Sequence, residues 1–123
     1  MPKYKSKHII KENSIKKGQK ISSLKNKIIH GETLLTLQKI PSQSIDLIIT
    51  SPSYFLGKKY EKDQEFSEYL NDHKIIIDEC SRVLKSDGAI FWNVAQSVSN
   101  GEITHLGSLF YSIFKELNFF LKN

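Results

Sequence analysis

The fold is decided by one stretch of the sequence, Ile45-Asp46-Leu47-Ile48-Ile49-Thr50-Ser51-Pro52-Ser53-Tyr54. Its first six residues are mostly apolar without strict alternation, which is typical of a parallel strand covered on both faces. The residues that follow leave this strand directly for a loop. A Ser-Pro-Ser sequence alone most often marks a simple turn. Ligands in open α/β sheets bind beyond the carboxyl ends of strands, so the loop is also a candidate functional site.

Apolar spacing predicts further helices and strands on both sides of this stretch. Helices are predicted over 34–40, which must end before Pro41, and over 65–85 and 105–117. Ser86-Asp87-Gly88 is predicted to stop the first long helix. Strands are predicted at 28–30, 45–50 and 89–94, with a further strand beginning at Phe119-Phe120-Leu121. The alternating order of strands and helices predicts the α/β class with a largely parallel sheet.

Positive charge is concentrated near the N-terminus. The 123 residues carry a net charge of +5, but residues 1–27 carry +8 and residues 28–123 carry −3. Residues 1–27 are therefore predicted to form a flexible, lysine-rich N-terminal arm that contacts phosphate, with a merely solvated tail as the alternative. Aliphatic residues spaced through the arm allow part of it to dock on the body of the protein (Ile9, Ile10, Ile15, Ile21 and Leu24).

Composition excludes several classes of protein. Hydrophobic residues make up 39% of the chain and charged residues 25%, which excludes a wholly disordered or fibrous chain. No apolar run approaches the ~18 residues of a membrane span and none has the pattern of a signal-peptide apolar region, so a cytoplasmic location without a membrane partner is expected. The one cysteine, Cys80, excludes an internal disulfide and lies on the apolar face of a predicted helix. The histidines lack metal-ligand spacing, so no metal site is predicted.

Several spaced motifs together resemble the DNA methyltransferases that methylate exocyclic amines. The family pattern is His-Gly-Asp, a short helix, then Asp-Leu, two apolar residues, and Thr-(Asp or Ser)-Pro-Pro-Tyr. Its counterparts here are Ile28-Ile29-His30-Gly31-Glu32 and the stretch 45–54. The resemblance covers roughly residues 28–122 and continues through Gly57-Lys58-Lys59-Tyr60, Glu68-Tyr69-Leu70, Arg82-Val83-Leu84-Lys85-Ser86-Asp87-Gly88, and the strand through Trp92 and Asn93.

The resemblance implies an enzyme that transfers a methyl group from S-adenosylmethionine to cytosine N4 or adenine N6 in double-stranded DNA. Ser51 Oγ and the Pro52 carbonyl would accept hydrogen bonds from the target amine, and Tyr54 would stack on the flipped-out base. The amine would attack the methyl group directly, so catalysis would rest on orientation and electrostatics. Phe55 and Lys58 are expected to contact the base or the DNA.

Two residues depart from the family pattern. Glu32 replaces the aspartate that contacts the cofactor from a strand end, which keeps the charge and adds one methylene group. Ser53 replaces the second proline, which should loosen the loop because proline fixes φ. Serine at the first motif position, here Ser51, is commoner among the N4-cytosine enzymes, so cytosine is the preferred target.

The glycine-rich turn that binds S-adenosylmethionine in this family has no counterpart here, because no two of the six glycines are separated by one residue. In the permuted branch of the family the catalytic half comes first. Residues 28–123 are therefore expected to form an N-terminal catalytic portion, a partial Rossmann-like sheet lacking the two cofactor-half strands. Those strands would lie between 28–30 and 45–50, which predicts a gap or an uncovered edge.

Several functions remain open at this stage. A truncated methyltransferase that is inactive alone is the first interpretation. One subunit of a split enzyme, whose partner chain carries the cofactor-binding half, is the second. A non-catalytic DNA-binding fragment and a degenerate remnant are the others. Methyl transfer after mixing with a chain that carries the cofactor half would discriminate between them.

Overall fold

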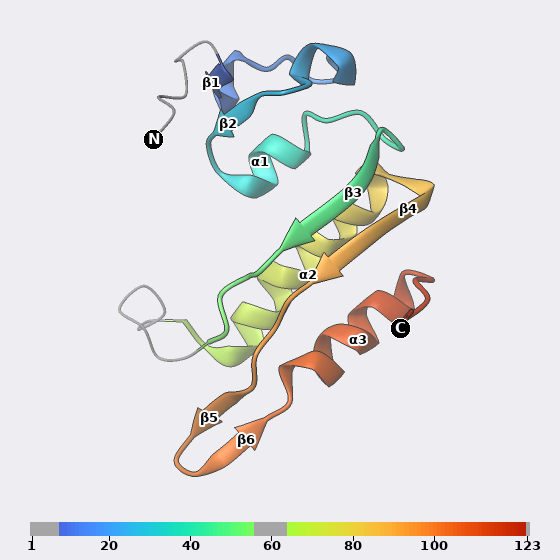
Figure 1. The fold of residues 1–123 in the computed structure, drawn as a ribbon. Coiled ribbons are helices and arrows are strands. Elements are labelled where there is room, and N and C mark those ends of the chain that lie inside the picture. Colours follow the sequence, from blue (N-terminus) through green and yellow to red (C-terminus); the bar gives the residue numbers. More distant parts are fainter. Residues whose placement is uncertain (1–7, 56–63, 123) are drawn as a thin grey trace, which may run out of the picture.

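The computed structural model describes residues 8–55 and 64–122, and Figure 1 shows the order of their helices and strands. The strands are β1 (Ile9–Lys11), β2 (Ile28–His30), β3 (Ile45–Thr50), β4 (Leu84–Trp92), β5 (Ser97–Ser99) and β6 (Glu102–Thr104). The α-helices are α1 (Thr33–Leu37), α2 (Phe66–Val83) and α3 (Leu106–Glu116), and two short 3-10 helices are η2 (Glu12–Ser14) and η3 (Ile21–Leu24). This mixed architecture agrees with the predicted α/β class. No helix among the described residues is long and apolar enough to cross a membrane.

The centre of the fold is the unit β3–α2–β4. The two strands pair in parallel from Leu47 opposite Ala89 to Thr50 opposite Trp92, and α2 lies behind them (Figure 1). The parallel pairing confirms the expectation from the apolar stretch. Because both strands run in the same direction, their carboxyl ends finish side by side.

The junction between α2 and β4 differs from the prediction. The helix ends at Val83, and Leu84 is already extended at φ −72° and ψ 137° and only 5% exposed. Ser86-Asp87-Gly88 therefore lies within β4, where the register with β3 shifts, and does not end the helix. A Cβ atom on Gly88 would lie 3.0 Å from the Asp46 carbonyl oxygen, so this irregular segment requires glycine. The burial of Leu84 explains why the strand begins so early.

Only one face of the β3–β4 pair is covered by the described residues. The core on that face consists of Tyr69 and Ile77 from α2 with Leu106 and Phe110 from α3. On the opposite face Ile49 is 72% exposed and Phe91 is 62% exposed. The expectation that the apolar strand 45–50 is buried on both faces is therefore wrong for the described structure.

The described part of the lysine-rich segment, residues 8–27, is folded. β1 pairs in parallel with β2, and Ile15 and Leu24 are buried at 4% and 7% exposure. Lys39 forms an ion pair with Glu12, and its Nζ also donates to the Glu12 carbonyl at 3.0 Å. The pairing of β1 with β2 therefore joins residues on the two sides of the predicted arm boundary at residue 27. Residues 8–27 form a small lobe and not a flexible arm. β2 and β3 belong to different sheets.

The C-terminal elements contain two further differences from the prediction. Phe119-Phe120-Leu121 forms no strand with the described residues, and Phe120 and Leu121 are 83% and 81% exposed. The antiparallel hairpin β5–β6 was not predicted. Its turn has positive φ at both Asn100 (51°) and Gly101 (80°), the conformation that an Asn-Gly pair favours. The Asn-Gly pair was the sequence signal for this hairpin.

Arg82 joins α2 to the end of α1 and the loop that follows. Its guanidinium donates to the Leu37 carbonyl at 2.8 Å, to the Ile40 carbonyl at 3.0 Å and to Ser42 Oγ at 3.0 Å. Glu79, one turn earlier on α2, pairs with the same guanidinium at 2.8 Å and holds its orientation. The planar fork of arginine suits this set of acceptors, and lysine could not reproduce it.

Replacing Arg82 by methionine should therefore lower the free energy of unfolding by about 2 kcal/mol, because backbone carbonyls that are partly buried lose their donors. Urea unfolding measures this change. The matched control is Lys74→Met, which removes an exposed pair with Glu116 and should cost under about 1 kcal/mol. Equal losses in the two variants would contradict the role given to Arg82.

Candidate active site

Three polar side chains meet at the carboxyl ends of β3 and β4. Ser51 Oγ and the Tyr54 hydroxyl share a short hydrogen bond. Asn93 Nδ2 donates to the Tyr54 hydroxyl at 3.1 Å and lies 3.4 Å from Ser51 Oγ. The Asn93 backbone N–H donates to the Thr50 carbonyl at 2.9 Å, which extends the strand pairing to this point. The parallel register therefore places Ser51 and Asn93 together although they are far apart in the sequence.

Asn93 is a site residue that sequence reasoning missed. The family resemblance included the strand through Trp92 and Asn93, but it gave Asn93 no role in the site. It is the first residue after β4, just as Ser51 is the first residue after β3. The predicted strand ran to residue 94 and so included Asn93; only its end at Trp92 in the structure puts Asn93 at the carboxyl end of a strand, where ligands of open α/β sheets bind.

The loop after β3 is held in place by contacts with α2 and β5. The Tyr69 hydroxyl donates to the Ser53 carbonyl at 2.5 Å, and Ser97 Oγ donates to the Phe55 carbonyl at 2.9 Å. The Phe55 ring packs against Phe66 and Tyr69 with centroids 5.3 and 5.1 Å apart. Phe55 itself has φ of 54°, a left-handed conformation that these contacts stabilise. The loop is thus fastened to α2 and β5 at two carbonyls.

These contacts leave two hydrogen-bond acceptors presented by the loop. The side chain of Ser51 is exposed, and its oxygen has lone pairs beyond the one shared with Tyr54. Among the described residues, no hydrogen bond reaches the Pro52 carbonyl oxygen. Ser51 Oγ and the Pro52 carbonyl oxygen are thus two acceptors at adjacent positions of the loop.

Glu32 occupies a different environment from the loop. Its Oε1 accepts from the Leu34 N–H at 3.0 Å and its Oε2 from the Leu35 N–H at 2.8 Å, so it is the N-cap of α1. A carboxylate has about four acceptor positions, so each oxygen can still accept another donor. Within residues 51–55, the described part of the loop, no residue forms a hydrogen bond or ion pair with Glu32. Lys58, predicted to contact DNA, lies outside the described residues.

Cys80 is part of the core and not of a catalytic site. Its side chain is 4% exposed on α2. Burial raises the pKa of the Cys80 thiol from about 9 to about 11, and the neighbouring charge of Glu79 adds to the rise. A thiol held protonated at neutral pH is a poor nucleophile, so covalent catalysis by cysteine is excluded for this residue.

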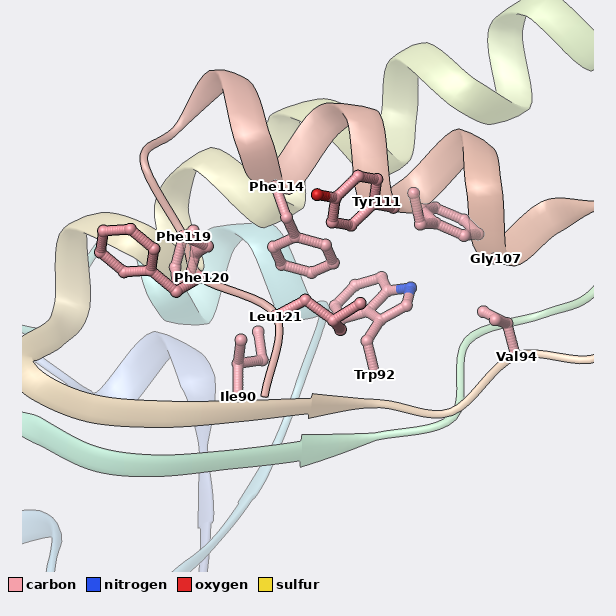
Figure 2. A pocket seen from close by; sticks show the side chains of 10 residues that line it. Ile90, Trp92, Val94, Gly107, Tyr111, Phe114, Phe119, Phe120 and Leu121 are labelled. Carbon is pink, nitrogen blue, oxygen red and sulfur yellow. The ribbon is translucent and has the colours of Figure 1, made fainter. Parts of the chain in front are cut away.

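A cavity of about 290 Å³ lies between α3 and β4, on the covered side of the sheet (Figure 2). Its lining is apolar and mostly aromatic, and residues 119–121 form part of it. Trp92 contributes a buried Nε1–H that has no acceptor among the described residues. The Ser51 loop does not line this cavity, so the cavity and the cluster of polar side chains are separate features.

Comparison with known proteins places the site in a family context. Residues 45–123 match the family of N6- and N4-specific enzymes described as DNA methylase. The chain is 40% identical over 99 residues to type II methyltransferase M.BglII of Bacillus subtilis. It is also 40% identical over 70 residues to the DNA adenine methyltransferase YhdJ of Escherichia coli.

A solved structure is similar as well. The PvuII DNA methyltransferase, described as cytosine-N4-specific, superimposes with a TM-score of 0.60 at 26% identity and matches 74% of this chain. The match with M.BglII covers 80% of this chain and that with YhdJ 52%. The chain spans only 28% of M.BglII, 23% of YhdJ and 34% of the PvuII structure.

The raised pKa of Cys80 makes stability depend on pH. Between about pH 9 and pH 11 the unfolded chain loses the thiol proton while the folded protein keeps it, so the free energy of unfolding falls as pH rises. Urea unfolding of the parent and Cys80→Ala at pH 8, 9, 10 and 11 isolates this contribution. The stability difference between them should decrease by roughly 2 kcal/mol over the series. A difference that stays constant would contradict the assignment.

Proposed function

Because this chain belongs to the N6/N4 DNA methylase family, we propose that it forms the catalytic-loop portion of a restriction–modification DNA methyltransferase that uses S-adenosylmethionine. Residues 28–123 supply that portion, and the enzyme acts on double-stranded DNA in the cytoplasm. The observation that carries the proposal is the pair of acceptors, Ser51 Oγ and the Pro52 carbonyl, on a loop fastened at the carboxyl end of β3.

The two acceptors address the main chemical difficulty of the reaction. The exocyclic amine of cytosine or adenine is conjugated with its ring and is a poor nucleophile. Hydrogen bonds from its two N–H groups to Ser51 and Pro52 favour a pyramidal nitrogen, which frees the lone pair for attack. Acceptors already in place need no reorganisation during the reaction, and this is how such groups lower a barrier. S-adenosylmethionine supplies the methyl group when bound.

Tyr54 and Asn93 complete the proposed site. The Tyr54 hydroxyl occupies a hydrogen-bonding position on Ser51 that an entering amine would take. Release of that hydroxyl leaves the Tyr54 ring able to stack on the flipped-out base. Asn93 is a positioning residue in this scheme, because its amide stays within reach of both hydroxyls and directs their protons and lone pairs.

Only part of a cofactor site is proposed for the described residues. Glu32 is the one candidate ligand, and both of its oxygens already cap α1. No two glycines of the chain are separated by one residue, so the glycine-rich turn of the family must come from other residues, on the same polypeptide or on a partner. The chain by itself is expected to transfer no methyl groups.

The proposed substrate follows from charge and from the loop. The lysines at 11, 16, 17, 20, 25 and 27 are exposed on the N-terminal lobe and suit contact with DNA phosphates. Ser51 at the first position of the loop favours cytosine N4 over adenine N6. The relatives include a cytosine-N4-specific enzyme and an adenine methyltransferase, so the target base must be measured. DNA binding without chemistry is the alternative that the lysines alone would support.

A chimera tests the function. The segment of M.BglII that matches this chain is replaced by it, and transfer of tritiated methyl groups to DNA is measured, with mass spectrometry of the nucleosides. We expect N4-methylcytosine, a loss of about 100-fold with Ser51→Ala and a loss of about 10-fold with Asn93→Ala.

Ser86→Ala is the matched control, because Ser86 is exposed in the irregular part of β4 and should leave transfer unchanged. Full activity of Ser51→Ala would refute the role of the hydroxyl. A folded chimera that binds DNA and methylates no base would favour the non-catalytic alternative.

Ser53 gives a second test in the same chimera. Proline at this position fixes φ and should reduce the motion of the Pro52 carbonyl, while the Ser53 carbonyl can keep its bond to Tyr69. Ser53→Pro is therefore expected to raise kcat severalfold with little change in KM. An unchanged kcat would contradict the hypothesis that Ser53 lowers activity by loosening the loop.

A further inference from the structure

Hydroxyl groups from two buried residues hold the loop on either side of Tyr54. The Tyr69 hydroxyl donates to the Ser53 carbonyl at 2.5 Å, and Ser97 Oγ donates to the Phe55 carbonyl at 2.9 Å. These carbonyls belong to the residues directly before and after Tyr54. We call the two hydrogen bonds the loop clamps. Figure 1 shows the start of α2 and the β5–β6 hairpin at the end toward which β3 and β4 run, so both clamps come from elements that reach this end.

Burial makes both hydroxyl groups costly unless they are bonded. Tyr69 is fully buried and Ser97 is 6% exposed. Phenylalanine would suit the aromatic surroundings of position 69 and alanine would suit position 97, because neither buries a polar group. Taking a hydroxyl out of water costs free energy unless it finds a hydrogen-bond partner. The loop carbonyls are such partners, so packing alone does not account for either hydroxyl.

The clamp from Ser97 also acts on an uncommon backbone conformation. Phe55 has φ of 54°, which is unfavourable for a bulky residue unless its surroundings hold it. Ser97 binds the carbonyl of this same residue, and the Phe55 ring packs 5.3 Å from that of Phe66. Loss of the clamp would favour a return of residue 55 to negative φ, and the backbone of Tyr54 would turn with it.

The clamps matter most when a base enters. In the structure the Tyr54 hydroxyl is bonded to Ser51 Oγ and to Asn93 Nδ2. During the proposed reaction an entering amine takes the place of that hydroxyl on Ser51, so this end of the Tyr54 side chain is released. The loop clamps act on the backbone and do not depend on the hydroxyl. They therefore keep the ring oriented after the release.

We propose that Tyr69 and Ser97 are positioning residues that hold the Tyr54 ring in the orientation needed for stacking on the target base. Neither is a catalytic residue, because each acts through the loop. The inference rests on the proposed function and adds to it two residues from elements other than β3 and β4. A ring that is oriented in advance loses less conformational freedom when the base binds, and correct orientation of the base contributes directly to the rate.

Kinetics in the chimera with M.BglII test the proposal. Tyr69→Phe keeps the buried ring and removes only the hydroxyl, and Ser97→Ala removes the other donor. Each is expected to lower kcat about tenfold, because the base is held in a poorer orientation. KM for DNA should change less than about twofold, because phosphate contacts dominate DNA affinity. Ser97→Thr keeps a hydroxyl and should restore most of the parent kcat.

Tyr111→Phe and Ser99→Ala are the matched controls. Tyr111 is 44% exposed on α3 and Ser99 is exposed on the same strand as Ser97, so both variants should leave kcat unchanged. Circular dichroism measures the folded fraction, and rates are expressed per folded enzyme. If Ser97→Ala does not fold, Tyr69→Phe decides the outcome. Equal losses in the controls, an unchanged kcat in Tyr69→Phe, or a change confined to KM would overturn the proposal.

A measurement without methyl transfer separates this proposal from the proposed function. The 123-residue chain is labelled with meta-fluorotyrosine, and Tyr54→Phe identifies the fluorine NMR signal of Tyr54. Ser97→Ala should move that signal toward its position in the unfolded chain, and Ser99→Ala should leave it in place. A signal that Ser97→Ala does not move would overturn the proposal. A signal that moves, in a chain whose chimera methylates no DNA, would refute the proposed function and leave the clamping of Tyr54 supported.

Discussion

The buried side chain of Tyr69 connects the core of this protein to its loop chemistry. The residue is fully buried, and its ring lies against Phe66, Phe55 and Phe110 at centroid distances of 5.9, 5.1 and 6.3 Å. Its hydroxyl donates to the Ser53 carbonyl in the loop after β3. A buried phenol must satisfy its hydroxyl, so the packing of α2 and the path of the loop cannot be changed independently.

Parallel pairing of β3 with β4 is the second constraint, and it accounts for both the polar cluster and the exposed apolar face that includes Ile49 and Phe91. The shared strand direction brings Ser51 and Asn93 to one edge, where their side chains and Tyr54 form a single hydrogen-bonded cluster. The same crossover through α2 places the helices on one side of the strands. The polar cluster is therefore formed although, among the described residues, only one face of the two strands is covered.

Local sequence signals predicted much of this arrangement. The apolar stretch before Ser51 is the strand expected, and the amphipathic spacing of α2 and α3 located both helices to within two residues. Other predictions from local sequence were incomplete or wrong. The Glu32 carboxylate, which the resemblance predicts to contact the cofactor, also caps α1 by accepting from the Leu34 and Leu35 N–H groups, and this second role was not predicted from the sequence. Leu84 was predicted as part of the helix. In the structure it is buried and pairs with Ile45, so it belongs to the strand. The expected strand at 119–121 has no described strand to pair with.

The sequence by itself determined the class of the fold, the position of the loop and its two acceptors, since these follow from periodicity and from residue identity at adjacent positions. The tertiary structure decided which distant groups join them. Asn93 reaches Tyr54, Arg82 joins α2 to α1, and residues 8–27 fold onto β2 because of pairings between segments far apart in the chain. The exposure of Ile49 and Phe91 also could not be predicted from the sequence, because an apolar strand has the same residue pattern whether one of its faces is covered or both are.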